Sequence, residues 1–261
     1  DKMQVTKRTG DKEEFSVEKI HKVVESATDG INGVSFFDIE MNANLSIYDG
    51  ISTKEIHQIL IKSANDLIST SEPNYQYVAA RLLNMQLRKD VWGCGHNPII
   101  FSLLIERNVD NGHYDPAILD KWSSDEIEEL EKYINHDRDD EFTYAGLQQM
   151  IDKYLIKNRE TEEIYETPQF AYMLIAMCLF NTVKEVREAY DMYSRFKINL
   201  PTPIMCGVRT VKRQFASCVL VDVEDDLDGI FSSVHAVGKY TANRAGIGLN
   251  VGRIRPINSP I

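Results

Sequence analysis

In the first ninety residues, a segment of alternating apolar and polar positions is followed by segments in which apolar residues recur at helical spacing. Residues 3–15 alternate around a Thr-Gly-Asp turn, which predicts a short hairpin. A helix is expected from the N-cap Ser16 to about residue 30, and a short one over 36–45. The capping box Ser52–Glu55 opens a third helix, and residues 75–91 form a fourth. These elements predict one compact unit.

The next hundred residues, 94–199, are mostly helical and acidic in pattern. Residues 125–131 form an acidic run that is typical of a solvated helix face. Residues 170–180 are apolar nearly all round, which predicts a buried helix. Apolar segments on both sides of the polar turn at 157–161 indicate a small hairpin.

The last sixty residues indicate parallel strands. Cys218 stands directly before a β-branched run, so we expect it to open a buried strand, and 246–251 form a second, Gly-spaced strand. Both resemble the first strands of an incomplete barrel, so we expect the chain to be the front part of a larger enzyme. The predicted domains are 1–93, 94–199 and 200–261. We expect the unpaired outer edges of these strands to pair with strands of another polypeptide.

Composition narrows the functional classes. The chain has 43% hydrophobic and 26% charged residues, and its net charge of −11 argues against a broad nucleic-acid interface. Its apolar runs are shorter than the ~20 residues that span a bilayer, and its N-terminus lacks an apolar leader core, so a cytoplasmic protein is expected. Four scattered cysteines and six histidines without ligand spacing predict no bound metal.

Three features have both a chemical and a structural interpretation. Lysines near helix N-termini in the first unit suit a phosphate site, but they are also ordinary surface residues. Cys218 is either a reactive thiol or an inert core residue. Gly246-Ile-Gly248 suggests a dinucleotide loop, but it follows a helix and opens a strand, which is the reverse of the order that a pyrophosphate needs.

The whole chain resembles the N-terminal third of the large (α) subunit of class Ia ribonucleoside-diphosphate reductases, including bacteriophage versions. The matching blocks lie in the family's order and nearly at its spacing: Val5–Arg8, Tyr48–Ile51, Tyr75–Leu82, Leu200–Met205, Arg213–Cys218 and Arg244–Gly248. The resemblance implies an α/β fold class. A mostly helical N-terminal region, an ATP-cone plus a helical segment, would lead into the first strands of a ten-stranded α/β barrel.

The ATP-cone of that family senses ATP against dATP and sets overall activity. By resemblance, the residues that contact the nucleotide are Lys7, Glu13, Glu14, Phe15, Ser16, Val17, Glu18, Lys19, Thr53, His57 and Lys89. Gln86 stands where some members have a histidine implicated in the dATP response. ATP binding is therefore better supported than inhibition by dATP.

The resemblance also implies a substrate site and a specificity-effector site. Cys218 would be one of two cysteines that reduce the ribose, with its partner beyond residue 261, and Thr202 and Ser217 would bind substrate. The effector residues would be Asp225, Asp226, Leu227 and Arg255; the family usually has Ser in place of Asp226. Cys206 is expected to be a replaceable small residue.

The implied partners lie outside this chain. They are the remainder of the large subunit, a second large subunit in a dimer, a small subunit carrying a di-iron tyrosyl radical, thioredoxin or glutaredoxin, and a ribonucleoside diphosphate. The chain itself would hold no cofactor, only the effectors ATP or dATP and a dNTP, and would bind neither nucleic acid nor membrane. The alternative is a nucleotide-sensing ATP-cone regulator without catalysis. That alternative pairs the cone with a Cys-x-x-Cys zinc module, which this sequence lacks.

Overall fold

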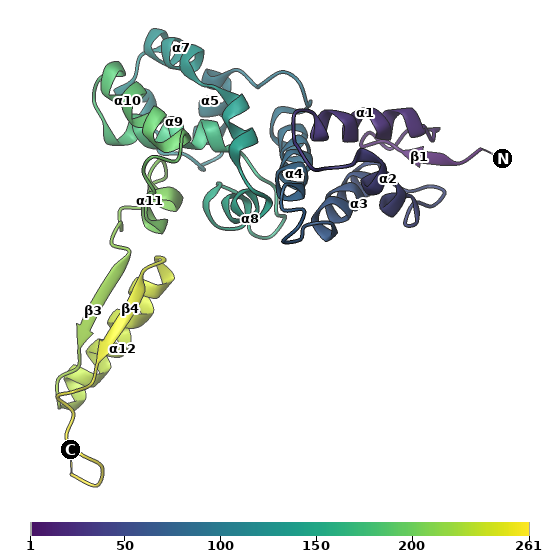
Figure 1. Ribbon diagram of the computed structural model, residues 1–261. Helices are drawn as coiled ribbons and strands as arrows, with labels where there is room; N and C mark the ends of the chain where they lie inside the picture. Colours follow the sequence, from purple (N-terminus) through teal and green to yellow (C-terminus); the bar gives the residue numbers. More distant parts are fainter. Residues whose placement is uncertain (1, 261) are drawn as a thin grey trace. The chain divides into compact units, whose positions relative to one another are not determined.

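The computed structural model describes residues 2–260, which form two compact units (Figure 1). The first unit comprises residues up to 104 and 127–171, and the second comprises 105–126 and 172 onward. Helices α5 (Phe101–Asp110), α7 (Ser124–Tyr133) and α9 (Pro168–Leu179) contribute residues to both. The domain boundaries at 93 and 199 stay predictions.

The first unit begins with the expected hairpin. Strands β1 (Gln4–Thr6) and β2 (Lys12–Glu14) pair antiparallel, with Gln4 opposite Glu14. Gly10 takes a φ of +89° in the turn, a conformation that costs glycine little because it has no Cβ. The backbone N–H of Thr6 donates to the Ile51 carbonyl at 2.9 Å, which ties the hairpin to the start of the third helix.

Four helices cover the hairpin, as the sequence predicts. They are α1 (Val17–Thr28), α2 (Phe36–Asn44), α3 (Thr53–Asp66) and α4 (Tyr75–Trp92). Ser16 caps α1, and Ser52 forms the expected capping box with Glu55 on α3. Their apolar faces meet in a core that includes Val24, Ile39, Leu60, Val78 and Leu82. Burial of these side chains is the main stabilising contribution in this unit.

The remaining elements of the first unit are α7 (Ser124–Tyr133), the 3-10 helix η1 (His136–Glu141), α8 (Tyr144–Gln149) and the π-helix η2 (Met150–Tyr154). The acidic run lies on α7, where only the apolar Ile127 and Leu130 are buried, as predicted. The small hairpin expected around 157–161 is confirmed as one antiparallel bridge, Lys157 with Ile164. The pairing goes no further because the Glu166 side chain accepts the Ile156 N–H.

A partly buried polar cluster lies where α4 meets η1. The Arg88 guanidinium donates to the His136 carbonyl at 2.7 Å and lies 3.5 Å from the Asp139 carboxylate. The His136 ring packs edge-on against Trp92 and Phe170. Burial and the Arg88 charge lower the pKa of His136 to about 4. Burial raises the pKa of Asp139 to about 6, against the lowering effect of Arg88.

These shifts predict a pH dependence that is specific to His136. Between pH ~6.5 and ~4 the unfolded chain binds a proton at this histidine and the folded chain does not, so the free energy of unfolding falls as pH falls. From pH 7 to pH 5 the loss amounts to about 2 kcal/mol. Asp139 acts oppositely, because its folded state holds the extra proton between pH ~4 and ~6.

Urea unfolding of wild type and His136→Gln at pH 7 and pH 5 measures the effect. The wild type is expected to lose about 2 kcal/mol more than the variant on acidification, since the variant has no proton to bind there. Asp139 is unchanged in both proteins, so its contribution cancels in the comparison. An equal loss in both proteins would show that His136 is protonated in the folded state.

The second unit contains α6 (Ala117–Lys121), α9, α10 (Val183–Ser194) and α11 (Thr202–Gly207). The buried helix predicted at 170–180 is confirmed as α9, in which residues 173–177 are fully buried. A capping box at Thr182 and Glu185 opens α10. These helices support the segment that leads to the strands.

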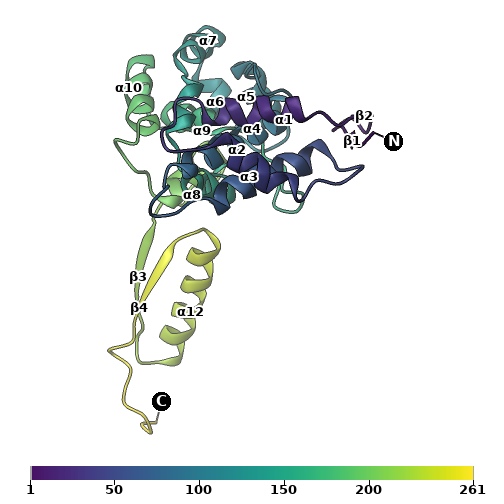
Figure 2. The ribbon, with the colours of Figure 1, turned by 45° about the vertical axis from the view of Figure 1, so that its right-hand side comes forward.

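The chain then forms a strand–helix–strand unit. Strand β3 (Cys218–Asp222) pairs in parallel with β4 (Gly246–Asn250), with Cys218 opposite Gly246, and α12 (Leu227–Ala242) connects them. Figure 2 shows α12 along one side of the strand pair. The parallel pairing and the strand start at Cys218 are confirmed.

The burial expected for these strands is wrong. Cys218 is exposed, and Leu220 and Leu249 are 88% and 51% exposed. Burial alternates along β3, because α12 covers one face while the other faces solvent. The apolar sequence therefore belongs to a strand that is covered on one face only.

Candidate nucleotide and substrate sites

The first unit has a pocket of about 350 Å³, which is the size of a small-ligand site. Residues from β1, β2, α1, α3 and α4 line it: Val5, Glu13, Phe15, Ser16, Lys19, Ile20, Lys22, Val23, Thr53, Ile56, His57, Leu60 and Lys89. One part of the lining is apolar and the other carries three lysines. This combination suits a ligand with a flat apolar portion and a negative charge.

Glu13 organises the lysines at one side of this pocket. Its carboxylate lies 3.0 Å from the ammonium groups of both Lys7 and Lys19. The hydrogen bonds from Lys7 and Lys19 lower the pKa of Glu13. Because one carboxylate pairs with two ammonium groups, Glu13, Lys7 and Lys19 together keep a net positive charge, which attracts an anion.

Lys89 supplies a further positive charge to the lining from α4. Burial and the nearby Arg8 lower the pKa of Lys89, and Arg8 itself pairs with Asp90 at 2.6 Å. Within residues 2–260 no carboxylate lies in ion-pair contact with Lys89. A partly desolvated ammonium without a carboxylate gains from a phosphate. Burial lowers the pKa of the neighbouring His57, which therefore lines the pocket as a neutral ring.

The structure gathers most of the predicted nucleotide residues in one place. Seven line the pocket: Glu13, Phe15, Ser16, Lys19, Thr53, His57 and Lys89. Lys7 does not line the pocket itself but forms an ion pair with Glu13, which does. Glu14, Val17 and Glu18 do not line it; Glu14 follows Glu13 on β2 and pairs with Lys2 at 2.8 Å.

Sequence reasoning missed Lys22 and the apolar lining. Lys22 and Val23 lie three and four residues after Lys19, so all three share one face of α1. That spacing was the available signal. The apolar side chains Ile20, Ile56 and Leu60 belong to the core and also line the pocket.

The predicted substrate residues stand at two element starts in the second unit. Thr202 begins α11 after Pro201, and Ser217 directly precedes β3. The Ser217 carbonyl accepts the Gly246 N–H at 2.7 Å, which fixes the backbone beside Cys218. The Cys218 thiol is exposed, so it is available to a reaction partner.

Two predicted effector residues contact each other. Arg255 donates through Nε to the Asp225 carboxylate at 2.7 Å and through Nη2 to its carbonyl at 2.8 Å. Desolvation raises the pKa of Asp225, but the bonds and charge from Arg255 lower it further, so the net shift is downward. Asp226 caps α12 by accepting the Gly229 N–H at 2.6 Å, and Leu227 is exposed.

Cys206 lies on α11, where the Arg244 guanidinium donates to its sulfur at 3.0 Å. Its expected role as a replaceable small residue stays a prediction. Across the described residues there is no cluster of three or more His, Cys, Asp or Glu side chains that could hold a metal ion. None of the described helices is long and apolar enough to cross a membrane.

A lysine-lined pocket under a hairpin and four helices, followed by helices and a parallel strand–helix–strand unit, defines a nucleotide-binding module joined to the start of an α/β catalytic domain. Three family models match the chain in succession. They are the ATP cone domain over 3–90, the ribonucleotide reductase all-alpha domain over 140–213 and the ribonucleotide reductase barrel domain over 216–261.

Curated relatives match over nearly the whole chain. Ribonucleoside-diphosphate reductase 1 subunit alpha of Escherichia coli K12 is 45% identical over 98% of this chain and 34% of its own length. The alpha subunits of Haemophilus influenzae and Enterobacteria phage T4 are 43% and 44% identical, each over 99% of this chain and 35% of the relative. The chain belongs to the ribonucleotide reductase large-subunit family and corresponds to its N-terminal part. It spans about a third of the length of these relatives.

Proposed function

We propose that this chain is the N-terminal portion of a cytoplasmic ribonucleoside-diphosphate reductase, a thioredoxin- or glutaredoxin-dependent oxidoreductase. It would act with the remainder of the large subunit and with a small subunit that generates a radical at a di-iron tyrosyl site. The observation that carries this proposal is the succession of cone, all-alpha and barrel matches along one chain. A regulator without catalysis has no use for the start of the barrel.

Within this enzyme the first pocket would bind ATP or dATP. Lys19 and Lys89 stand on different walls and would bind the phosphates, with Lys7 drawn in through Glu13. The apolar wall formed by Val5, Ile20 and Leu60 would receive the base. The contact between base and wall is apolar and that between phosphate and lysine is charge-assisted, so the nucleotide would lie in one orientation.

At the barrel start Cys218 would act as one thiol of a redox pair. Two thiols together supply two electrons and two protons, the ribose 2′ hydroxyl leaves as water, and the thiols end as a disulfide. Thioredoxin or glutaredoxin would then reduce that disulfide. Exposure of Cys218 supports the proposal, because disulfide exchange requires access to the sulfur. Thr202 and Ser217 would hold the substrate at the edges of this site.

The proposal is tested by assembly. The 261-residue chain is combined with a complementary polypeptide that carries the rest of the barrel and with the small subunit, and CDP reduction is measured with and without ATP. We expect turnover only in the full mixture, with stimulation by ATP. Turnover by this chain with the small subunit alone, or none from a demonstrably assembled mixture, would refute the proposed function.

The carboxylate at Asp226 gives a separate prediction for the specificity effector. An extra negative charge beside a triphosphate repels it, so Asp226→Ser is expected to tighten dNTP binding roughly two- to fivefold, as for an exposed charge pair. Serine is also a good N-cap, so α12 keeps its first turn. Equilibrium binding of dNTPs to the assembled enzyme measures the change. Unchanged affinity would place Asp226 away from the phosphates.

A further inference from the structure

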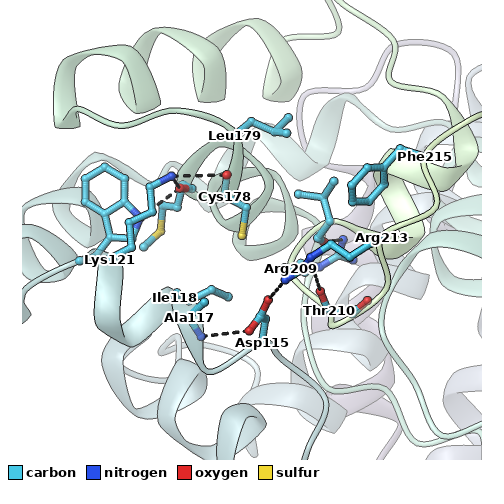
Figure 3. A pocket seen from close by; sticks show the side chains of 13 residues that line it. Asp115, Ala117, Ile118, Lys121, Cys178, Leu179, Arg209, Thr210, Arg213 and Phe215 are labelled. Atoms are coloured by element: carbon cyan, nitrogen blue, oxygen red, sulfur yellow. Dashed lines mark hydrogen bonds and ion pairs between the residues drawn. The ribbon is translucent and has the colours of Figure 1, made fainter.

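The second unit contains a cavity that none of the proposed nucleotide or substrate residues lines. Its volume is about 290 Å³, near the lower end of typical ligand pockets. Helix α6, the end of α9 and the segment after α11 enclose it (Figure 3). The apolar part of its lining consists of Ala117, Ile118, Trp122, Met177, Leu179, Val208 and Phe215.

The charged side chains around this cavity are mostly cationic. Lys121 lies on one side, and Arg209 and Arg213 on the other (Figure 3). Asp115 is the single carboxylate of the lining, so the formal charge of the four groups is +2, in a chain whose net charge is −11. A cationic cavity in an acidic protein attracts small anions.

The existing contacts leave part of this charge uncompensated. Asp115 forms an ion pair with Arg213 and also accepts the Ala117 N–H at 3.0 Å, so its charge is already used. The Lys121 ammonium donates to two neutral acceptors, the carbonyls of Met177 at 2.9 Å and of Cys178 at 3.4 Å. The ammonium also lies 5.4 Å from the centroid of the Trp122 ring. Neither the carbonyl groups nor the ring neutralise its charge, so it retains its attraction for a carboxylate.

The aromatic side chains define the rest of the ligand. Trp122 is buried and its indole N–H already donates to the Met177 carbonyl at 3.0 Å, so its ring is fixed in place. Phe215 lies across the cavity in the segment that leads to β3. Rings and aliphatic side chains around a cationic rim bind a flat apolar body that carries one negative group.

From these observations we infer that the cavity binds a small aromatic carboxylate, with the carboxylate near Lys121 and the ring system between Ile118, Trp122 and Phe215. The inference does not depend on the reductase activity. The wall formed by 208–215 connects α11 to β3, so an occupant also restrains the backbone that precedes Ser217 and Cys218.

The test uses the full 261-residue chain and two probes of nearly equal shape, 2-naphthoate and neutral 2-naphthamide. Calorimetry is expected to show naphthoate binding about tenfold more tightly, the effect of one charge-assisted contact. Naphthoate is also expected to slow amide hydrogen exchange in residues 208–215. Equal affinity of the two probes, no binding of naphthoate, or unchanged exchange in 208–215 would overturn the inference.

Variants locate the charge. Lys121→Met keeps the aliphatic stem and is expected to reduce the preference for naphthoate to less than about twofold. Arg213→Gln changes an exposed side chain and replaces Lys121→Met in the test if that variant does not fold. The loss of its positive charge should also weaken naphthoate binding. Lys212→Met is the matched control, since it removes the same charge from a neighbour that does not line the cavity. A preference that persists in the folded variants, or is lost in the control, would overturn the inference.

Discussion

Replacing Cys218 with serine is expected to abolish multiple-turnover reduction of CDP by the assembled enzyme. Serine has nearly the same shape, and the thiol is exposed at the start of β3, so folding should be unaffected. A hydroxyl cannot form the disulfide that balances the reduction of the ribose. Steady-state formation of dCDP with thioredoxin or dithiothreitol as reductant measures the loss.

Cys206→Ser provides the matched control. It makes the same atomic replacement on α11, where the expected role is that of a replaceable small residue, so it should retain turnover. Folding of both variants is compared by circular dichroism. If the Cys218 variant turned over normally, Cys218 would have no part in the redox chemistry, and equal loss in both variants would indicate a structural effect.

Replacing Lys89 with methionine is expected to weaken ATP binding by roughly one to two orders of magnitude, which corresponds to about 1.5–3 kcal/mol for one charge-assisted phosphate contact. Methionine keeps an apolar stem at this position on α4 and removes only the ammonium group. Calorimetry of the full 261-residue chain with ATP, at one fixed ionic strength, measures the affinity.

The control for this experiment is Lys62→Met. Lys62 is exposed on α3, pairs with Asp66 at 2.6 Å and does not line the pocket, so its loss should leave ATP affinity nearly unchanged. This comparison separates a direct phosphate contact from the overall change in charge. Wild-type affinity in a folded Lys89 variant would exclude this lysine from the phosphate site.

The parts of the fold that sequence predicts well are those set by neighbouring residues. Ser16 caps the helix that it precedes, and Ser52 and Glu55 form a reciprocal box within four positions. The parallel pairing of β3 and β4 was also predictable, since a strand–helix–strand pattern of this length returns the second strand beside the first. Family resemblance added residue roles that spacing alone left open.

The candidate sites were only partly predictable. Sequence supplied Lys19, Thr53 and Lys89 through resemblance, but not the fact that Lys22 shares their pocket. Likewise, no local sequence pattern predicts that Arg255 donates to the Asp225 carboxylate. These contacts join residues that are far apart in the chain, and their geometry depends on how whole elements pack.

By itself, then, the sequence determined the caps, the helix periods, the strand order and the family, because short-range hydrogen bonds and apolar spacing specify them. Tertiary structure alone decided that Cys218 is exposed, that no carboxylate among the described residues 2–260 contacts Lys89, and that Lys121 and Arg213 share a cavity. Exposure and charge compensation are properties of everything that surrounds a side chain. They are settled only when distant segments pack together.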